Sequence, residues 1–198
     1  MKRKLLAIIA IVCVAAFVLS ACGNGGKSSG GSGGSDGGAV QTYDVGKFTV
    51  TVPAGWNAFP QDDTLEPKDA EGNYPIDPER ILLAKDAKDE FEAYSKPCID
   101  ISWYSTNAYV LDSRSFYDNV KDISGVKIKG KECTAYSGTT ANGYTYQCIH
   151  YEGDDAQYDF NIRIAIDGKD TGITWEDPEV KSILESVTVK TDSETESK

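Results

Sequence analysis

The chain has 198 residues, of which 40% are hydrophobic and 26% are charged, and its formal net charge is −11. This acidity excludes nucleic acid and anionic lipid headgroups as favoured partners, because both are negatively charged themselves. Residues 40–190 are enough for one domain with its own hydrophobic core, and too few for a two-lobed transport receptor.

The first 21 residues have the layout of a secretory signal peptide. Three basic residues at positions 2–4 precede an uninterrupted apolar run over residues 5–19, and these 15 residues are fewer than the roughly 20 that a membrane-spanning helix needs. The segment Leu19-Ser20-Ala21-Cys22 resembles the bacterial lipobox, in which a branched aliphatic residue and two small residues precede an invariant cysteine. The resemblance implies transfer of diacylglycerol to Cys22 and cleavage between Ala21 and Cys22.

A lipidated Cys22 would hold the mature protein on the extracytoplasmic face of the cell membrane, since two or three acyl chains such as palmitate bind for practical purposes permanently. Loss of residues 1–21 removes three positive charges and no negative one, so the formal charge changes from −11 to −14. Two alternatives remain open. One is an ordinary cleaved signal peptide with an incidental cysteine, and the other is an uncleaved anchor that contains Cys13.

A tether is expected behind the lipidated cysteine. The 17 residues from 23 to 39 are dominated by Gly and Ser and contain no aromatic or branched aliphatic side chain, so they cannot bury enough surface to fold. As a flexible coil they span about 20–25 Å. Residues 191–198 form a polar, acidic tail that we predict to be disordered. The expected organisation is therefore a signal peptide (1–21), a lipidated cysteine and tether (22–39), one domain (40–190) and a tail (191–198).

The first half of the domain contains three predicted strands. Residues 47–52 alternate apolar and polar side chains, Pro53 ends this strand, and Trp56 follows as a core aromatic. Residues 59–78 hold four prolines and many acids, which predicts a long loop. Residues 80–84 are assigned to a strand, although the preceding Asp-Pro-Glu also resembles a helix start. Residues 98–104 alternate again and predict the third strand.

Between and after these strands, short helical segments are expected. Residues 86–94 are charged and predict a loop or a turn of helix. Asp112 or Ser113 can cap a short helix that runs to about Lys121, with Phe116 and Val120 on one face.

The second half of the domain predicts three strands and a helix. Residues 126–137, 144–151 and 158–167 are separated by turn-rich segments of six residues each, and such short links favour antiparallel neighbours. In the third strand one face is apolar and the other polar. Asp177 and Pro178 then begin a helix, with a closing strand over residues 187–190. The apolar residues of this helix recur at i, i+3, i+4 and i+7 and should lie on a sheet: Val180, Ile183, Leu184 and Val187.

Residues 48–56 (FTVTVPAGW), the central meander and residues 177–187 (DPEVKSILESV) together resemble the PsbP-like α/β/α sandwich. This fold is known from an extrinsic subunit of photosystem II, from a nuclear factor that binds the GTPase Ran, and from bacterial lipoproteins. The resemblance implies an α+β domain over residues 45–190, with a mainly antiparallel sheet and the C-terminal helix packed on it. It carries no catalytic or ligand-binding residue.

Three cysteines remain in the domain, and an exported protein can form disulfides. We expect a disulfide between Cys133 and Cys148, with Cys98 as a free thiol; the alternative is three reduced cysteines. An open loop over residues 138–143 would place Cys133 opposite Cys148. A tight turn at Asn142-Gly143 would instead leave the two sulfur atoms about 13 Å out of register. We expect the open loop.

No catalytic, metal or cofactor site is expected. Cys148 and the chain's one histidine, His150, should lie on the same face of a strand, about 6–7 Å apart along it and too far for a hydrogen-bonded pair. A zinc site of Cys133, Cys148 and His150 lacks closely spaced cysteine pairs. The acidic segments 154–155 and 167–170 lack the pattern of an EF-hand, and no Gly-x-Ser-x-Gly elbow occurs.

Two functions follow. The favoured one is a non-catalytic binding or assembly module at the cell envelope, whose partner is a protein, a peptide or a glycan. The alternative is an envelope enzyme, such as a glycan hydrolase, that uses the loop carboxylates Asp86, Asp89, Glu90 and Glu92. A pocket in which carboxylates converge would favour the enzyme, whereas an open surface with aromatic residues would favour binding; the candidate aromatics are Tyr104, Tyr109 and Tyr144.

Overall fold

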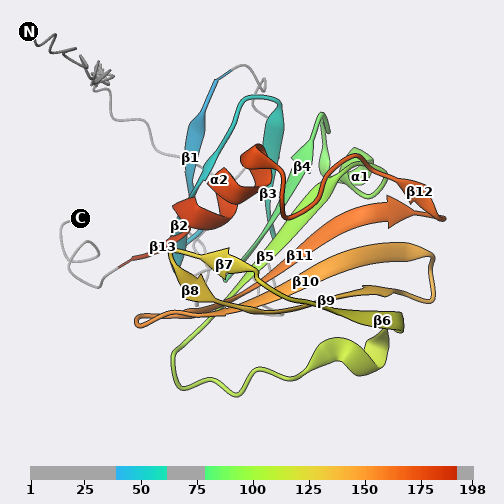
Figure 1. Ribbon diagram of the computed structural model, residues 1–198. Coiled ribbons are helices and arrows are strands. Elements are labelled where there is room, and N and C mark those ends of the chain that lie inside the picture. Colours follow the sequence, from blue (N-terminus) through green and yellow to red (C-terminus); the bar gives the residue numbers. More distant parts are fainter. Residues whose placement is uncertain (1–38, 62–78, 191–198) are drawn as a thin grey trace, which may run out of the picture.

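The computed structural model describes residues 39–61 and 79–190 (Figure 1). The signal peptide, Cys22, the tether up to residue 38, most of the proline-rich segment and the acidic tail lie outside the described residues. Those that are described form an α+β domain built mostly from antiparallel strands. None of the helices in these two ranges is long and apolar enough to cross a bilayer.

A large antiparallel sheet forms the body of the domain. Its strands, in spatial order, are β3 (Trp56–Gln61), β4 (Arg80–Lys85), β5 (Cys98–Tyr104), β11 (Gln157–Ile166), β10 (Tyr144–Glu152), β9 (Thr134–Thr139) and β6 (Asp118–Ile123). The short strand β12 (Lys169–Asp170) pairs with the end of β11. The predicted strands 80–84, 98–104, 144–151 and 158–167 are thus confirmed to within one or two residues.

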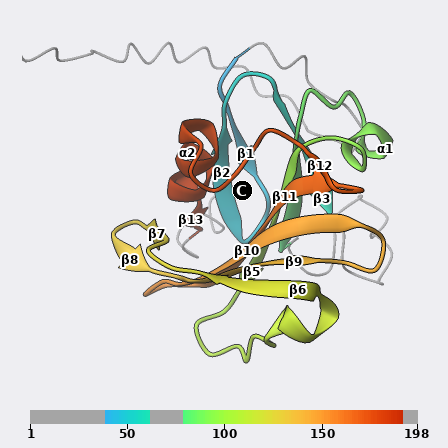
Figure 2. The ribbon, with the colours of Figure 1, turned by 45° about the vertical axis from the view of Figure 1, so that its right-hand side comes forward.

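A smaller layer covers one face of this sheet. It consists of a second sheet, in the order β1 (Gln41–Asp44), β2 (Phe48–Val52) and β13 (Thr188–Val189), together with helix α2 (Pro178–Ser186). Helix α2 packs against β2, and a two-stranded hairpin of β7 (Lys127–Ile128) and β8 (Lys131–Glu132) lies beside it (Figure 2). The opposite side carries helix α1 (Glu90–Ala93) and the 3₁₀ helix η1 (Ser113–Phe116).

The main hydrophobic core lies between the large sheet and the α2 layer. Trp56 is 2% exposed, which confirms it as a core residue, and the apolar face of α2 is buried as its periodicity predicts. Helix α2 begins with Pro178, and Asp177 is its N-cap, but the Asp177 carboxylate accepts bonds from Thr174 and not from the helix. Among the most completely buried side chains of this core are Phe48, Val50, Val52, Ile81, Leu83, Ile99, Ile101, Ile149, Phe160, Ile162, Val180, Ile183 and Leu184.

Three sequence predictions are wrong because strand pairing overrides the local pattern. The single strand expected over residues 126–137 is divided into the β7–β8 hairpin and β9. The chain does not enter a loop at residue 59, since β3 continues to Gln61 and pairs with β4; a strand at the sheet edge tolerates a proline because one of its sides makes no ladder bonds. Residues 112–121 do not form one helix. After the short turn of η1, β6 pairs with β9, and Phe116 is left 68% exposed.

The hairpin between β9 and β10 corrects the predicted disulfide. Thr139 pairs with Thr145, and the Thr140 N–H donates to the Tyr144 carbonyl oxygen at 2.8 Å, so residues 141–143 close the turn, with Gly143 in the left-handed region at φ = 81°. This is the three-residue hairpin in which a type I turn is followed by a left-handed residue, and neither the open loop nor the two-residue turn. Cys148 therefore pairs with Tyr136. Cys133 packs toward the core and Cys148 lies on the opposite face, so both are free thiols.

Candidate functional site

The face of the large sheet that points away from α2, here called the outer face, gathers polar side chains from separate parts of the chain. Cross-strand pairing places Ser102 beside Asp159, and Asp159 beside His150. In the neighbouring row, Asn161 stands beside Cys148, and Cys148 beside Tyr136. The period of two along each strand directs these residues outward while their neighbours fill the core.

A pocket of about 200 Å³ opens on this face. One wall is the chain over residues 110–114, and the floor is formed by strands β9, β10 and β11. The polar or reactive side chains of the pocket are Asp112, Ser113, Arg114, Thr134, Tyr136, Cys148, His150, Glu152, Asp159 and Asn161. Cys148 and His150 do share one face of a strand, as the sequence predicts, and both reach this pocket.

The segment over residues 105–117, here called the 105–117 loop, is held at both ends. At its start the Gln157 side-chain nitrogen lies 3.0 to 3.1 Å from the carbonyl oxygens of Ser105, Thr106 and Ala108. At its end the hydroxyls of Ser113 and Tyr136 are 2.6 Å apart. In Figures 1 and 2 the loop lies under the sheet, on the side away from α2. The wall of the pocket is therefore fixed by contacts with β9 and β11.

Arg114 contributes the permanent positive charge of the pocket. Its guanidinium contacts Asp112 at 2.9 Å and Asp122 at 3.2 Å, and it lies 4.6 Å from the centre of the Tyr136 ring. The pKa of Asp112 is lowered, first by the hydrogen bond from the Arg114 backbone and then by its guanidinium. The partners of Arg114 are thus two carboxylates and the face of an aromatic ring.

A histidine–aspartate pair lines the same pocket as Arg114. His150 Nδ1 is 2.7 Å from Asp159 Oδ1, while Nε2 is 3.5 Å from Glu152. The hydrogen bond with Asp159 raises the pKa of His150, and burial opposes the shift. Burial, and after it the charge of Asp159, raises the pKa of Tyr104 to about 12. The Asp159 carboxylate thus orients His150 and acts on Tyr104, two residues that come from different strands.

Cys148 is held as a thiol. It is only 4% exposed, and burial raises its pKa, with hydrogen bonds to the hydroxyls of Tyr117 and Tyr136 as a smaller opposing effect. A thiol is a weak nucleophile compared with a thiolate. Burial likewise raises the pKa of Cys98 to about 12 and the pKa of Cys133 above its ordinary value. The three cysteines therefore behave as small, apolar packing residues.

A second polar cluster on the outer face surrounds the buried Arg163, which is 4% exposed. Its Nη1 donates to the carbonyl oxygens of Tyr94 at 2.8 Å and Ala93 at 3.1 Å, and its Nε donates to the Tyr146 hydroxyl at 3.2 Å. The guanidinium also lies 4.7 Å from the Tyr144 ring centre. Sequence reasoning placed Arg163 on a polar face and missed its burial. The signal was the pair of tyrosines at alternate positions of the neighbouring strand.

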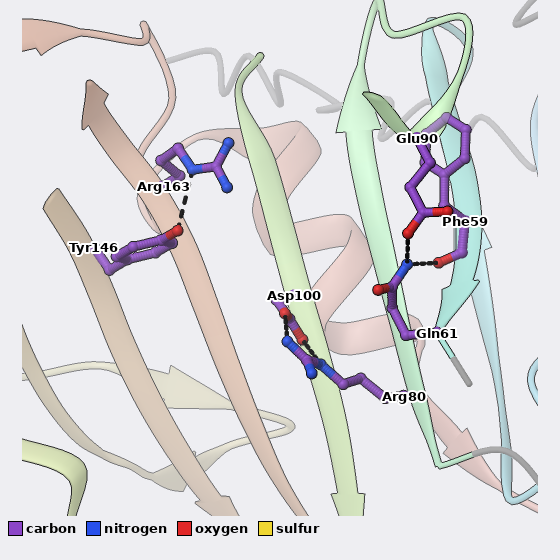
Figure 3. A network of polar contacts seen from close by, with 7 residues as sticks. All are labelled: Phe59, Gln61, Arg80, Glu90, Asp100, Tyr146 and Arg163. Atoms are coloured by element: carbon purple, nitrogen blue, oxygen red, sulfur yellow. Dashed lines mark hydrogen bonds and ion pairs between the residues drawn. The ribbon is translucent and has the colours of Figure 1, made fainter. Parts of the chain in front are cut away.

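The loop carboxylates of the enzyme hypothesis gather around helix α1, away from the pocket walls. Asp89 caps the helix by accepting a bond from the Glu92 backbone at 2.8 Å. Glu92 accepts from the Lys88 backbone at 3.0 Å, and Glu90 accepts from the Gln61 amide at 2.9 Å (Figure 3). Asp86 occupies a turn with φ = 56°. Asp89, Glu90 and Glu92 thus satisfy local donors, and the carboxylates that reach the pocket are Asp112, Glu152 and Asp159.

The three candidate aromatics are not brought together. Tyr104 is half-buried near Asp159, Tyr144 packs on Arg163, and Tyr109 is 89% exposed on the 105–117 loop.

Another polar pair of the outer face is formed by Arg80 and Asp100, with Arg80 Nε 2.8 Å from Asp100 Oδ1 (Figure 3).

The two acidic segments considered for calcium make local contacts. Asp154 pairs with Lys131 at 2.5 Å, and Asp170 accepts from the Gly172 backbone at 2.7 Å. Over residues 39–61 and 79–190, no three His, Cys, Asp or Glu side chains are grouped so that they could hold a metal ion.

The comparisons with known proteins leave the family open. No family model matches the chain, and no curated protein matches it. A crystal structure of a protein from Bacteroides thetaiotaomicron VPI-5482, determined at 1.50 Å resolution, is similar with 13% sequence identity and a TM-score of 0.44. The match covers 79% of this chain and 50% of that protein. The chain thus spans about half the length of this neighbour, and a likeness of this size shows neither the fold nor the function.

Proposed function

We propose that the chain is a lipid-anchored binding module of the cell envelope, which holds a protein, peptide or glycan ligand in the pocket beneath the 105–117 loop. The observation that carries the proposal is that the loop is attached at two points, by the Gln157 side chain and by the Ser113–Tyr136 contact. A wall fixed before the ligand arrives loses little conformational entropy on binding, which raises affinity.

The pairing of the reactive groups favours binding over turnover. His150 is held between Asp159 and Glu152, and Cys148 is a buried thiol with tyrosine hydroxyls as partners. Nucleophilic catalysis needs an activated nucleophile within hydrogen-bond reach of a base. The hydrogen bonds of His150 and Arg114 instead lock the polar atoms of the pocket in fixed directions, as a recognition surface requires.

The proposal also includes the lipid anchor of the protein and its fold family. Cys22 carries the lipid, cleavage falls between Ala21 and Cys22, and the mature domain works at the outer face of the cell membrane. A PsbP-like α/β/α sandwich is the proposed fold family, supported by β2, the buried Trp56 and helix α2 in the expected order. Cys22→Ala should move the protein from the detergent phase to the aqueous phase in a phase-partitioning assay. Unchanged partitioning would refute the lipid anchor.

Capture and turnover, measured side by side, test the binding function. The whole chain is incubated with cell-wall glycan fragments, with peptides and with envelope extract, and both bound material and products are quantified. We expect saturable capture without product, weakened by Gln157→Leu and unchanged by the matched control Gln61→Leu, whose amide serves the α1 region. Product formation that is lost in Glu152→Gln would overturn the proposal in favour of the hydrolase.

A further inference from the structure

Exposed apolar side chains gather on the 105–117 loop. Tyr109 is 89% exposed, Leu111 is 61% exposed and Phe116 is 68% exposed. Scattered exposed apolar residues are ordinary, but several on one segment beside a pocket mark an interaction surface. Leu111 is itself part of the pocket wall, so the rim of the pocket is apolar at this point.

The exposure is a fixed feature of the loop. Gln157 holds the carbonyl oxygen of Ala108, immediately before Tyr109. Ser113 is held by Tyr136, two residues after Leu111. These two attachments hold the backbone on either side of Tyr109 and Leu111 in place.

Negative charge dominates the interior of the pocket. Three carboxylates line it, from Asp112, Glu152 and Asp159, against two basic side chains, Arg114 and His150. Arg114 is in addition paired with Asp122, outside the pocket lining. Glu152 is the most open of the three carboxylates, with 77% of its side chain exposed. A cationic group that enters the pocket would thus meet the exposed Glu152 carboxylate near the mouth, which also lies 3.5 Å from His150 Nε2, under the attraction of a chain with a net charge of −11.

On the basis of the binding function proposed above, we propose that the pocket takes a basic side chain from a peptide whose neighbouring residues are apolar. The ammonium or guanidinium group enters between the carboxylates near Glu152, and the flanking apolar side chains pack on Leu111 and Tyr109. Charge gives the complex its specificity and its rate of association, while the apolar rim gives it most of its affinity.

The test uses the whole chain in detergent and the fluorescent peptide acetyl-Gly-Leu-Lys-Leu-Gly-amide, with fluorescence anisotropy as the readout. Two further peptides replace Lys by norleucine, which keeps the apolar stem, or by Glu. Protein variants are Glu152→Gln and Leu111→Ser, and their matched controls are Glu176→Gln and Val40→Ser, which change exposed residues outside the pocket. Phosphatidylcholine vesicles provide a membrane probe.

The Lys peptide should bind saturably, and the norleucine and Glu peptides should bind more weakly. Glu152→Gln should weaken the binding of the Lys peptide about threefold, and Leu111→Ser should weaken it about fivefold or more. Both control variants should bind this peptide as the unchanged protein does. Equal binding of the three peptides would overturn the inference, as would peptide binding that neither pocket variant affects. Vesicle binding that depends on Leu111, without peptide binding, would assign the apolar rim to a membrane. Capture of glycan or extract components without any Lys-peptide binding would refute this inference alone and leave the proposed function standing.

Discussion

Gln157 is the residue whose replacement tests the fixed loop most sharply. Gln157→Leu keeps the size of the side chain and removes the amide that bonds to the carbonyl oxygens of Ser105, Thr106 and Ala108. The backbone pairing of Gln157 with Tyr104 and with Glu152 does not involve the side chain and should persist. The substitution therefore loosens the loop without dismantling the sheet.

The expected change in the free energy of loop opening follows from the number of N–H groups that the substitution removes. The amide group has two N–H bonds, and each hydrogen bond contributes about 0.5–1.5 kcal/mol net, so opening of the loop should become easier by about 1–3 kcal/mol. Since 1.4 kcal/mol is about a factor of ten, this corresponds to about fivefold to 150-fold faster exchange of amides that exchange through loop opening. The Ala108 N–H, which bonds to the Ser105 carbonyl at 3.0 Å, reports this opening directly.

Native-state hydrogen exchange read by NMR is the assay. Faster exchange should be confined to residues 105–117, with the amides of β5 and β11 near their original rates. Gln61→Leu removes a comparable amide that bonds to Glu90 and Phe59, and it should leave the loop unaffected. Unchanged exchange at Ala108 in Gln157→Leu would refute the argument that this side chain fixes the loop.

Three further results are expected. Leu184→Ala should lower the free energy of unfolding in urea by about 2–5 kcal/mol, because Leu184 is 2% exposed in the core. A change near zero would contradict the packing of α2 against the core. Titration with a thiol reagent should find Cys98, Cys133 and Cys148 free in the unfolded, unreduced protein and largely unreactive in the native one. Two thiols missing from the count would show that a disulfide forms after all. The Asp159 pairing raises the pKa of His150, so its stabilisation is full below the unfolded pKa of about 6.5 and is lost as pH rises through the higher folded value. His150→Asn should therefore cost more stability at pH 5.5 than at pH 8.5, and an equal cost at both would contradict the pairing.

Much of the fold could be predicted because one face of each main strand is buried. The alternation in β5 and β11 and the i, i+3, i+4 pattern of α2 are direct imprints of that burial. Over residues 112–121 the pattern was misleading. Phe116 and Val120 have helical spacing, but both are exposed, Phe116 lies in η1, and β6 pairs with β9 as an edge strand. Local periodicity cannot reveal that a partner strand is available.

The register of the β9–β10 hairpin was harder to predict, because a link of six residues can close in several ways. The register depends on Gly143 in the left-handed region. It determines which residue of β9 pairs with Cys148. The pocket depends on registers of the same kind. His150 meets Asp159 only through the pairing of β10 with β11, and the role of Gln157 requires the 105–117 loop to return under the sheet. Sequence reasoning named Cys148 and His150 correctly as same-face neighbours, yet it had no signal for Gln157, Arg114 or Asp159.

The central claim is that the pocket under the 105–117 loop is where the domain binds its ligand. Hydrogen exchange of the whole chain, measured by mass spectrometry with and without envelope extract, tests this claim even while the ligand is unidentified. We expect added protection over residues 105–117 and over the parts of β9, β10 and β11 that form the pocket floor. Protection confined to the acids around α1, or to the layer of α2 and β2, would contradict the claim.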